Sequence, residues 1–278
     1  MKRSLVVLLG LLVLLALSAM SPPPAAAQAA AQATAQPAAK PAPSIDEILE
    51  RSIRATGGRE AWKKLTSLRA KGAAEISGAD VTGAFEFLAK APNKSAQTIT
   101  LSTPGGAIVV RQGFDGQQGW KDLPGQGLQD LSGEELSQTK RDAEFYGELK
   151  FRELYPHITY LGEEDVNDRG AYVIRAATAD GAARKMYFDK QSGLRVRMDD
   201  EKGVGGNPPS QSYFDDYKEV PGTGVKLPST MRVVTPMATV VLHVEEFAPN
   251  AVIDDALFAK PAAADATGGP SPNDKAPQ

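Results

Sequence analysis

The first patterned segment of the chain, residues 44–58, has apolar side chains at helical spacing. They recur every three or four positions and so share one helix face: Ile45, Ile48, Leu49 and Ile53. Ser44 with Glu47 three residues later predicts a capping box at the start of this helix. Gly57 and Gly58 are typical of a helix end, where the backbone turns left-handed.

Two more helical segments are predicted. The stretch 59–65 is a short helix that turns Trp62 inward, and 133–146 is a longer one. Ser132 and Glu135 predict a second capping box before the longer helix. Its apolar face is thin, so we expect it to lie over a sheet edge or an opening rather than inside a core. The stretch 150–156 adds a further helical turn.

Elsewhere the hydrophobic period changes from about 3.6 to 2, which predicts half-buried antiparallel strands. Helices and strands do not alternate, so a parallel doubly wound sheet is excluded. The fold class is therefore α+β and mainly β. The predicted strands are 67–76, 81–89, 95–101, 107–114, a short strand resuming at Trp120, 157–166, 171–177, 183–189, 194–200, 212–220, 225–234 and 238–249.

The two ends of the chain differ from this middle. Lys2 and Arg3 precede an apolar run and an Ala-x-Ala site, which predicts a signal peptide over 1–27 and export to the periplasm or beyond. An uncleaved anchor is the alternative. No cysteine follows the run, so a lipid-modified N-terminus is not expected. Residues 28–43 read as a disordered Ala/Gln/Pro-rich linker and 262–278 as a disordered tail, leaving one domain at 44–261 with no further membrane span.

Composition then removes several functions. The formal charge is −3 and no basic stripe is present, which argues against nucleic-acid binding. The chain has no cysteine and only two histidines, His157 and His243, so neither thiol chemistry nor a metal site is expected. His243 is expected to face solvent. No P-loop, nucleophile elbow or nucleophile–base pair is found, so we expect neither an enzyme nor a cofactor.

One stretch, 114–124 ("FDGQQGWKDLP"), carries the most specific pattern. Asp115-Gly116 is a turn signal after an apolar strand, and the alternation resumes at Trp120. A hairpin explains this better than a catalytic loop, because no base or nucleophile accompanies it. We therefore expect Trp120 to be buried on the helix-facing side of the sheet.

The spacing D-G-x-x-x-W-x-x-x-P in this stretch resembles the LolA-like family of periplasmic outer-membrane lipoprotein carriers. The order of "LAKAPNK", "DLSGEEL", "DAEFYGEL", "MYFDKQSG" and "FDDYKEVPGTGVKLPSTMRV" is similar to that family over residues 44–261. The resemblance implies a curved antiparallel sheet, a half-open barrel wrapped around helices, with an apolar cavity between them. One feature departs: the carriers have a gating arginine after the Pro-Asn turn, whereas this chain has "PNKSAQT".

The expected function is that of a non-enzymatic exported protein that binds a lipid or an acylated lipoprotein, with a role in outer-membrane lipoprotein sorting. Its ligand would enter a concave, mostly apolar cavity. The alternative is an envelope sensor or protein-interaction module on the same fold, whose cavity is a packed core. The candidate lining residues are Phe85, Phe87, Ile99, Val110, Trp120, Tyr172, Ile174, Met186 and Phe188.

Overall fold

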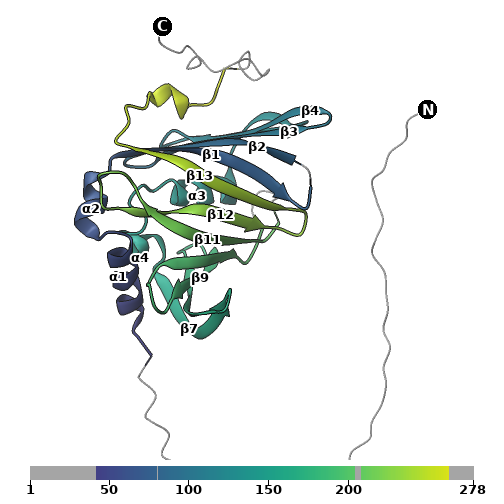
Figure 1. Cartoon of the computed structure of the whole chain (residues 1–278). Coiled ribbons are helices and arrows are strands. Elements are labelled where there is room, and N and C mark those ends of the chain that lie inside the picture. Colours follow the sequence, from purple (N-terminus) through teal and green to yellow (C-terminus); the bar gives the residue numbers. More distant parts are fainter. Residues whose placement is uncertain (1–41, 80, 204–207, 263–278) are drawn as a thin grey trace, which may run out of the picture. The chain divides into compact units, whose positions relative to one another are not determined.

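A computed structural model describes residues 42–79, 81–203 and 208–262. The predicted signal peptide and nearly all of the predicted linker and tail lie outside these residues. The described residues build one antiparallel sheet of 13 strands with a few short helices (Figure 1). The predicted fold class is confirmed.

The sheet consists of two meanders joined side by side. Strands β1 to β6 follow one another from the middle to one edge, and β7 to β13 run from the other edge back to the middle, where β13 pairs with β1. The bounds are β1 Ser67–Ser77, β2 Val81–Lys90, β3 Lys94–Thr103, β4 Gly106–Phe114, β5 Gly119–Leu123, β6 Gly127–Asp130, β7 His157–Val166, β8 Arg169–Ala177, β9 Ala183–Asp189, β10 Arg195–Asp200, β11 Ser210–Glu219, β12 Lys226–Val234 and β13 Thr239–Pro249.

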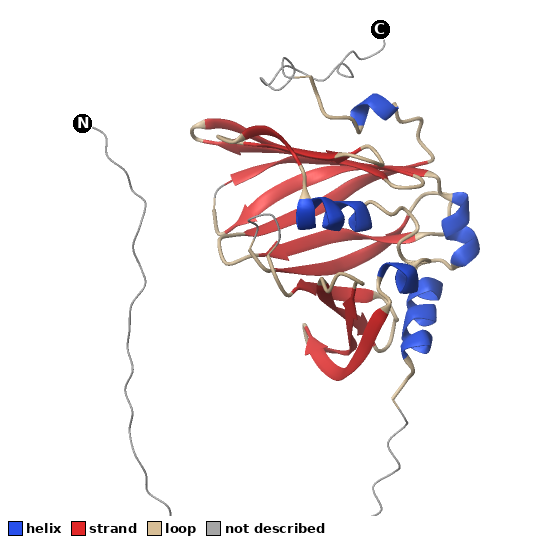
Figure 2. Ribbon diagram, turned by 180° about the vertical axis from the view of Figure 1, so that it is seen from behind, coloured by secondary structure: helices blue, strands red, loops and turns tan. Residues whose placement is uncertain are grey.

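This strand order fixes the path of the chain between the meanders. Because β6 and β7 are the two opposite edges of the sheet, the segment 131–156 that links them has to cross one face. Figure 2 shows α3 (Gly133–Asp142) lying across that face, with α4 (Phe151–Leu154) beyond it. We call this side of the sheet the inner face and the other side the outer face.

The N-terminal helices form as the sequence predicts. In α1 (Ile45–Ala55) both hydrogen bonds of the capping box between Ser44 and Glu47 are present. Of the predicted apolar residues, Ile45, Ile48 and Leu49 pack with residues of the sheet, and Ile53 is buried. After the turn at Gly57 and Gly58, α2 (Arg59–Lys64) buries Trp62.

The second predicted capping box is wrong. Helix α3 begins after Ser132, but the Ser132 side chain makes no capping bond. Instead, both carboxylate oxygens of Glu135 accept hydrogen bonds from Lys121 Nζ on β5, at 2.8 and 2.9 Å. The helix also ends at Asp142, four residues earlier than predicted. A partner distant in sequence has taken the side chain that local spacing assigned to the cap.

The outer face of β2 to β5 is covered by the C-terminal segment, which includes a short 3₁₀ helix, η1 (Asp255–Leu257). Phe258 is fully buried there, and Trp120 donates a hydrogen bond from Nε1 to its carbonyl oxygen at 2.9 Å. Trp120 is therefore buried as predicted but lies on the outer face, which corrects the expected side. Alternation explains this, because its neighbour Lys121 points to α3.

Candidate functional site

The inner face of the first meander and the adjoining strands carries an apolar surface that we call the floor. Its buried centre comprises Ala70, Ala74, Phe85, Leu101, Leu242 and Val244. The apolar residues around this centre are only partly buried: Ile76, Val81, Phe87, Ile99, Met231, Val240 and Phe247. Ile108, opposite Leu101 in the register, is 37% exposed. Cover over this part of the sheet is thus incomplete.

The predicted lining residues fall into three groups. Four belong to the floor: Phe85, Phe87 and Ile99, with Val110 beside Ile99 in the register. A second four belong to a closed core under α1 and α4: Tyr172, Ile174, Met186 and Phe188. Of these, Tyr172 is only partly buried and lies at the border of the core. Trp120 lies on the outer face. Ile174 and Met186 are at most 2% exposed, so they are core positions rather than pocket walls.

Helix α3 crosses the inner face and is held at both ends by polar contacts (Figure 2). Near its N-terminal end Glu135 binds Lys121, and further along the helix Thr139 Oγ1 accepts a hydrogen bond from Gln112 Nε2 of β4 at 3.4 Å. At its C-terminal end Asp142 binds Arg184 of β9. The helix therefore ties the first meander to the second. Few apolar side chains take part, in line with its thin apolar face.

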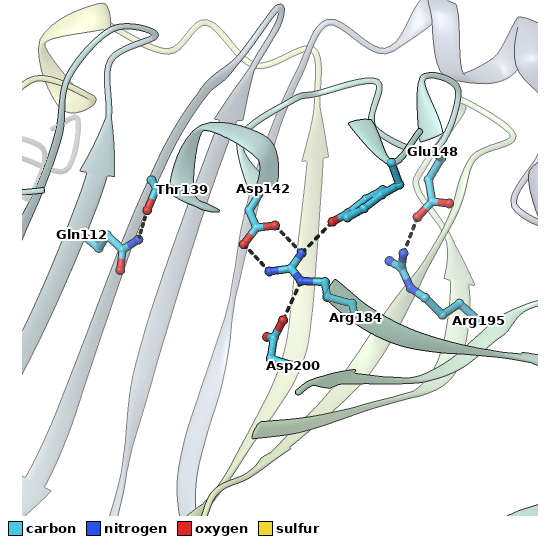
Figure 3. Close-up of polar contacts among 8 residues, drawn as sticks. Gln112, Thr139, Asp142, Glu148, Arg184, Arg195 and Asp200 are labelled. Carbon is cyan, nitrogen blue, oxygen red and sulfur yellow. Dashed lines mark hydrogen bonds and ion pairs between the residues drawn. The ribbon is translucent and has the colours of Figure 1, made fainter. Parts of the chain in front are cut away.

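Arg184 forms the larger of these attachments (Figure 3). Its Nη1 and Nη2 donate to the two carboxylate oxygens of Asp142 at 2.5 and 2.9 Å, and its Nε donates to Asp200 at 2.6 Å. Nη1 also reaches the Tyr155 hydroxyl at 3.2 Å. Burial acts to lower the pKa of Arg184, but the two carboxylates outweigh it and the net shift is upward, so the guanidinium stays charged.

A second arginine, Arg195, lies near it on the inner side of β10, where a bulge interrupts the pairing with β9. Its guanidinium is 5.0 Å from the centre of the Phe214 ring, and Nη1 lies 2.9 Å from Glu148 Oε1 in the segment between α3 and α4. The Arg195 Nε is buried and has no hydrogen-bond partner within residues 42–79, 81–203 and 208–262. Sequence reasoning missed both arginines, because nothing in their local spacing distinguishes them from surface charges.

Two hollows border these elements. One, of about 130 Å³, lies between α3 and the β8–β9 turn and has a mixed lining that includes Arg141, Tyr155, Arg184 and Lys202. The other, of about 350 Å³, lies on the outer face beside Arg69, Leu88 and the C-terminal segment. Val252 and Leu257 of that segment are 104% and 39% exposed.

Other chemistry finds little support in the described part of the chain. No group of three or more His, Cys, Asp or Glu side chains there could hold a metal ion. His243 is exposed on β13, as predicted, and its Nδ1 lies 3.5 Å from Thr230 Oγ1. Among the helices of residues 42–262 that the structure describes, none is long and apolar enough to cross a membrane.

Comparison with known proteins identifies the fold. No protein-family model and no curated sequence matches the chain. A LolA superfamily protein from Nitrosomonas europaea is similar in structure with a TM-score of 0.50 at 15% identity, covering 79% of this chain and 99% of that one. A domain from Vibrio parahaemolyticus named for outer membrane lipoprotein sorting gives 0.50 at 13% identity, with coverages of 78% and 98%. The chain has a LolA-like fold, which confirms the resemblance.

Proposed function

We propose that this protein binds a lipid or an acyl-bearing ligand between the floor and α3. The observation that carries this proposal is the incomplete cover of the floor, where large apolar side chains such as Phe87, Ile99 and Met231 remain partly exposed. Contiguous apolar surface on a folded chain marks an interaction site more often than chance exposure does. An acyl chain laid on this surface would bury it and supply the cover that α3 does not.

The driving force would be burial of methylene groups. Each buried methylene contributes about 0.8 kcal/mol, so affinity rises with chain length until the floor is filled. Helix α3 has a thin apolar face and is held mainly by polar contacts. A chain that inserts beneath it would therefore displace little apolar packing.

We further propose that the protein is exported, is not an enzyme and acts in outer-membrane lipoprotein sorting on acylated lipoproteins. The signal-like N-terminus supports export. The LolA-like fold supports carriage, and the Vibrio parahaemolyticus domain of that fold is named for lipoprotein sorting. No nucleophile–base pair was found in the sequence, which supports a binding role over catalysis.

The test is titration of the purified protein with fatty acids and fatty alcohols of increasing length. Affinity should rise with each added methylene by about fourfold, the equivalent of 0.8 kcal/mol, and then level off. Ile99→Trp fills the floor and should abolish binding of the longest chains. Val109→Trp is the matched control, because Val109 lies on the neighbouring strand β4 and points to the outer face.

A protein-interaction role is the second candidate, favoured by the exposed Val252 and Leu257 beside the outer hollow. If no chain length binds, or if Ile99→Trp binds as well as the parent, the lipid proposal fails and this role replaces it.

A further inference from the structure

Arg195 differs from the other inner-face arginine in how its charge is met. Arg184 is held by three hydrogen bonds to two carboxylates, whereas the only ion pair of Arg195 within the described residues is the single contact from Nη1 to Glu148 at 2.9 Å. A guanidinium has five N–H donors, in a planar fork that suits two oxygens of one anion. Most of the donors of Arg195 therefore have no partner among the residues that the structure describes.

The position of Arg195 is unusual for an incompletely paired charge. Burial is the largest influence on its pKa and acts to lower it, while the Glu148 carboxylate raises it and the net shift is upward. Yet its side chain remains 25% exposed. The group thus lies below the protein surface, with part of its side chain still accessible to solvent although Nε is buried.

Its surroundings continue directly into the floor. The guanidinium covers the ring of Phe214, and Phe214 pairs in the register with Met231, which packs against the floor cluster. A charged group beside an apolar surface suits a ligand that combines an anionic group with an alkyl chain. Such a ligand could place its chain on the floor and its anion against the free N–H groups.

We propose that Arg195 receives the anionic group of the acyl ligand, a carboxylate or a phosphate, and that this group displaces Glu148. The proposal rests on the proposed function, since it assigns the polar end of the same ligand. Glu148 belongs to the segment 143–150 between α3 and α4. In the free protein it serves as a replaceable counter-ion, because one carboxylate oxygen makes one contact where an incoming anion can make two.

The experiment compares three ligands with one alkyl chain: palmitate, hexadecyl phosphate and hexadecanol. Arg195→Gln should weaken palmitate and hexadecyl phosphate about 10- to 100-fold, as loss of a hydrogen bond to a charged group does. Hexadecanol binding should stay as in the parent. Glu148→Gln should tighten binding of the two anions and leave hexadecanol unchanged. Preference for palmitate or hexadecyl phosphate identifies which anion the site takes.

Arg169→Gln is the matched control, because Arg169 also pairs with a single carboxylate, that of Asp215, and is 49% exposed. It should leave all three affinities unchanged. If Arg195→Gln and Glu148→Gln keep the parent's ratio of anion to alcohol affinity, the assignment of Arg195 is overturned, while hexadecanol binding by the parent still upholds the lipid site. If Arg195→Gln does not fold, Glu148→Gln decides alone. A parent that binds none of the three ligands overturns both proposals.

Discussion

Replacing Arg184 by methionine should detach the C-terminal end of α3 from β9. Methionine keeps the apolar stem and removes the guanidinium, so Asp142, Asp200 and Tyr155 lose their shared donor. Breaking a buried ion pair costs about 3–5 kcal/mol. Asp142 is 45% exposed and regains water once it is released, so we expect the lower end, about 3 kcal/mol.

Hydrogen exchange of the α3 amides measures this loss. A local cost of about 3 kcal/mol corresponds to roughly 100-fold faster exchange, at a factor of ten for every 1.4 kcal/mol. The effect should be confined to residues 133–142, with the central strands β1 and β13 retaining their protection. Arg169→Met removes an exposed pair, worth about 1 kcal/mol or less, and should leave α3 unchanged. The reasoning is refuted if Arg184→Met leaves α3 exchange as slow as in the parent.

Three further outcomes are expected. Trp120→Ala should lower the free energy of unfolding in urea by about 3–5 kcal/mol, because a 5% exposed indole is removed; a loss below about 1 kcal/mol would contradict its burial. Gly113→Ala should destabilise the protein clearly, because an added Cβ would lie 2.6 Å from the Trp120 ring. Gly105→Ala should have little effect, because the nearest atom to its Cβ would be Thr103 Oγ1 at 3.8 Å. Equal urea midpoints for the two variants would contradict this packing. Hydrogen bonds from Lys90 and Lys94 lower the pKa of Asp255 to about 2. The stability that the Asp255 carboxylate contributes is therefore fully present above its ordinary pKa near 4 and is lost as the pH falls through about 2. Trp120 fluorescence should report release of the C-terminal segment between these two pH values in the parent and not in Asp255→Asn.

The strands and the first helix were predictable because their signals are local. Period-2 alternation located the strands of both meanders except the four-residue edge strand β6, which was missed, and the Ser44–Glu47 spacing identified a capping box that the structure contains. In both cases the residues that decide the structure lie within a few positions of one another. At these sites the local preference and the final fold agree.

Where long-range contacts decide, local patterns were insufficient. Ser132 and Glu135 have the same spacing as Ser44 and Glu47, yet Glu135 binds Lys121. Alternation showed that Trp120 and Lys121 point to opposite faces, but not which face the helices cover. The four candidates under α1 and α4 share residue types with the four on the floor, and only tertiary packing separates a closed core from an open surface.

The pairing of β1 with β13 explains what the sequence left open about α3. Without that pairing the two meanders have no fixed order, and no face is assigned to the segment between them. With it, residues 131–156 must pass from one edge of the sheet to the other over the inner face. A helix held there mainly by apolar burial could leave only by exposing that surface to water, at about 25 cal/mol per Å². Because α3 is instead attached through Lys121 and Arg184, its release depends on breaking these two ion pairs and not on exposing a large apolar surface to water.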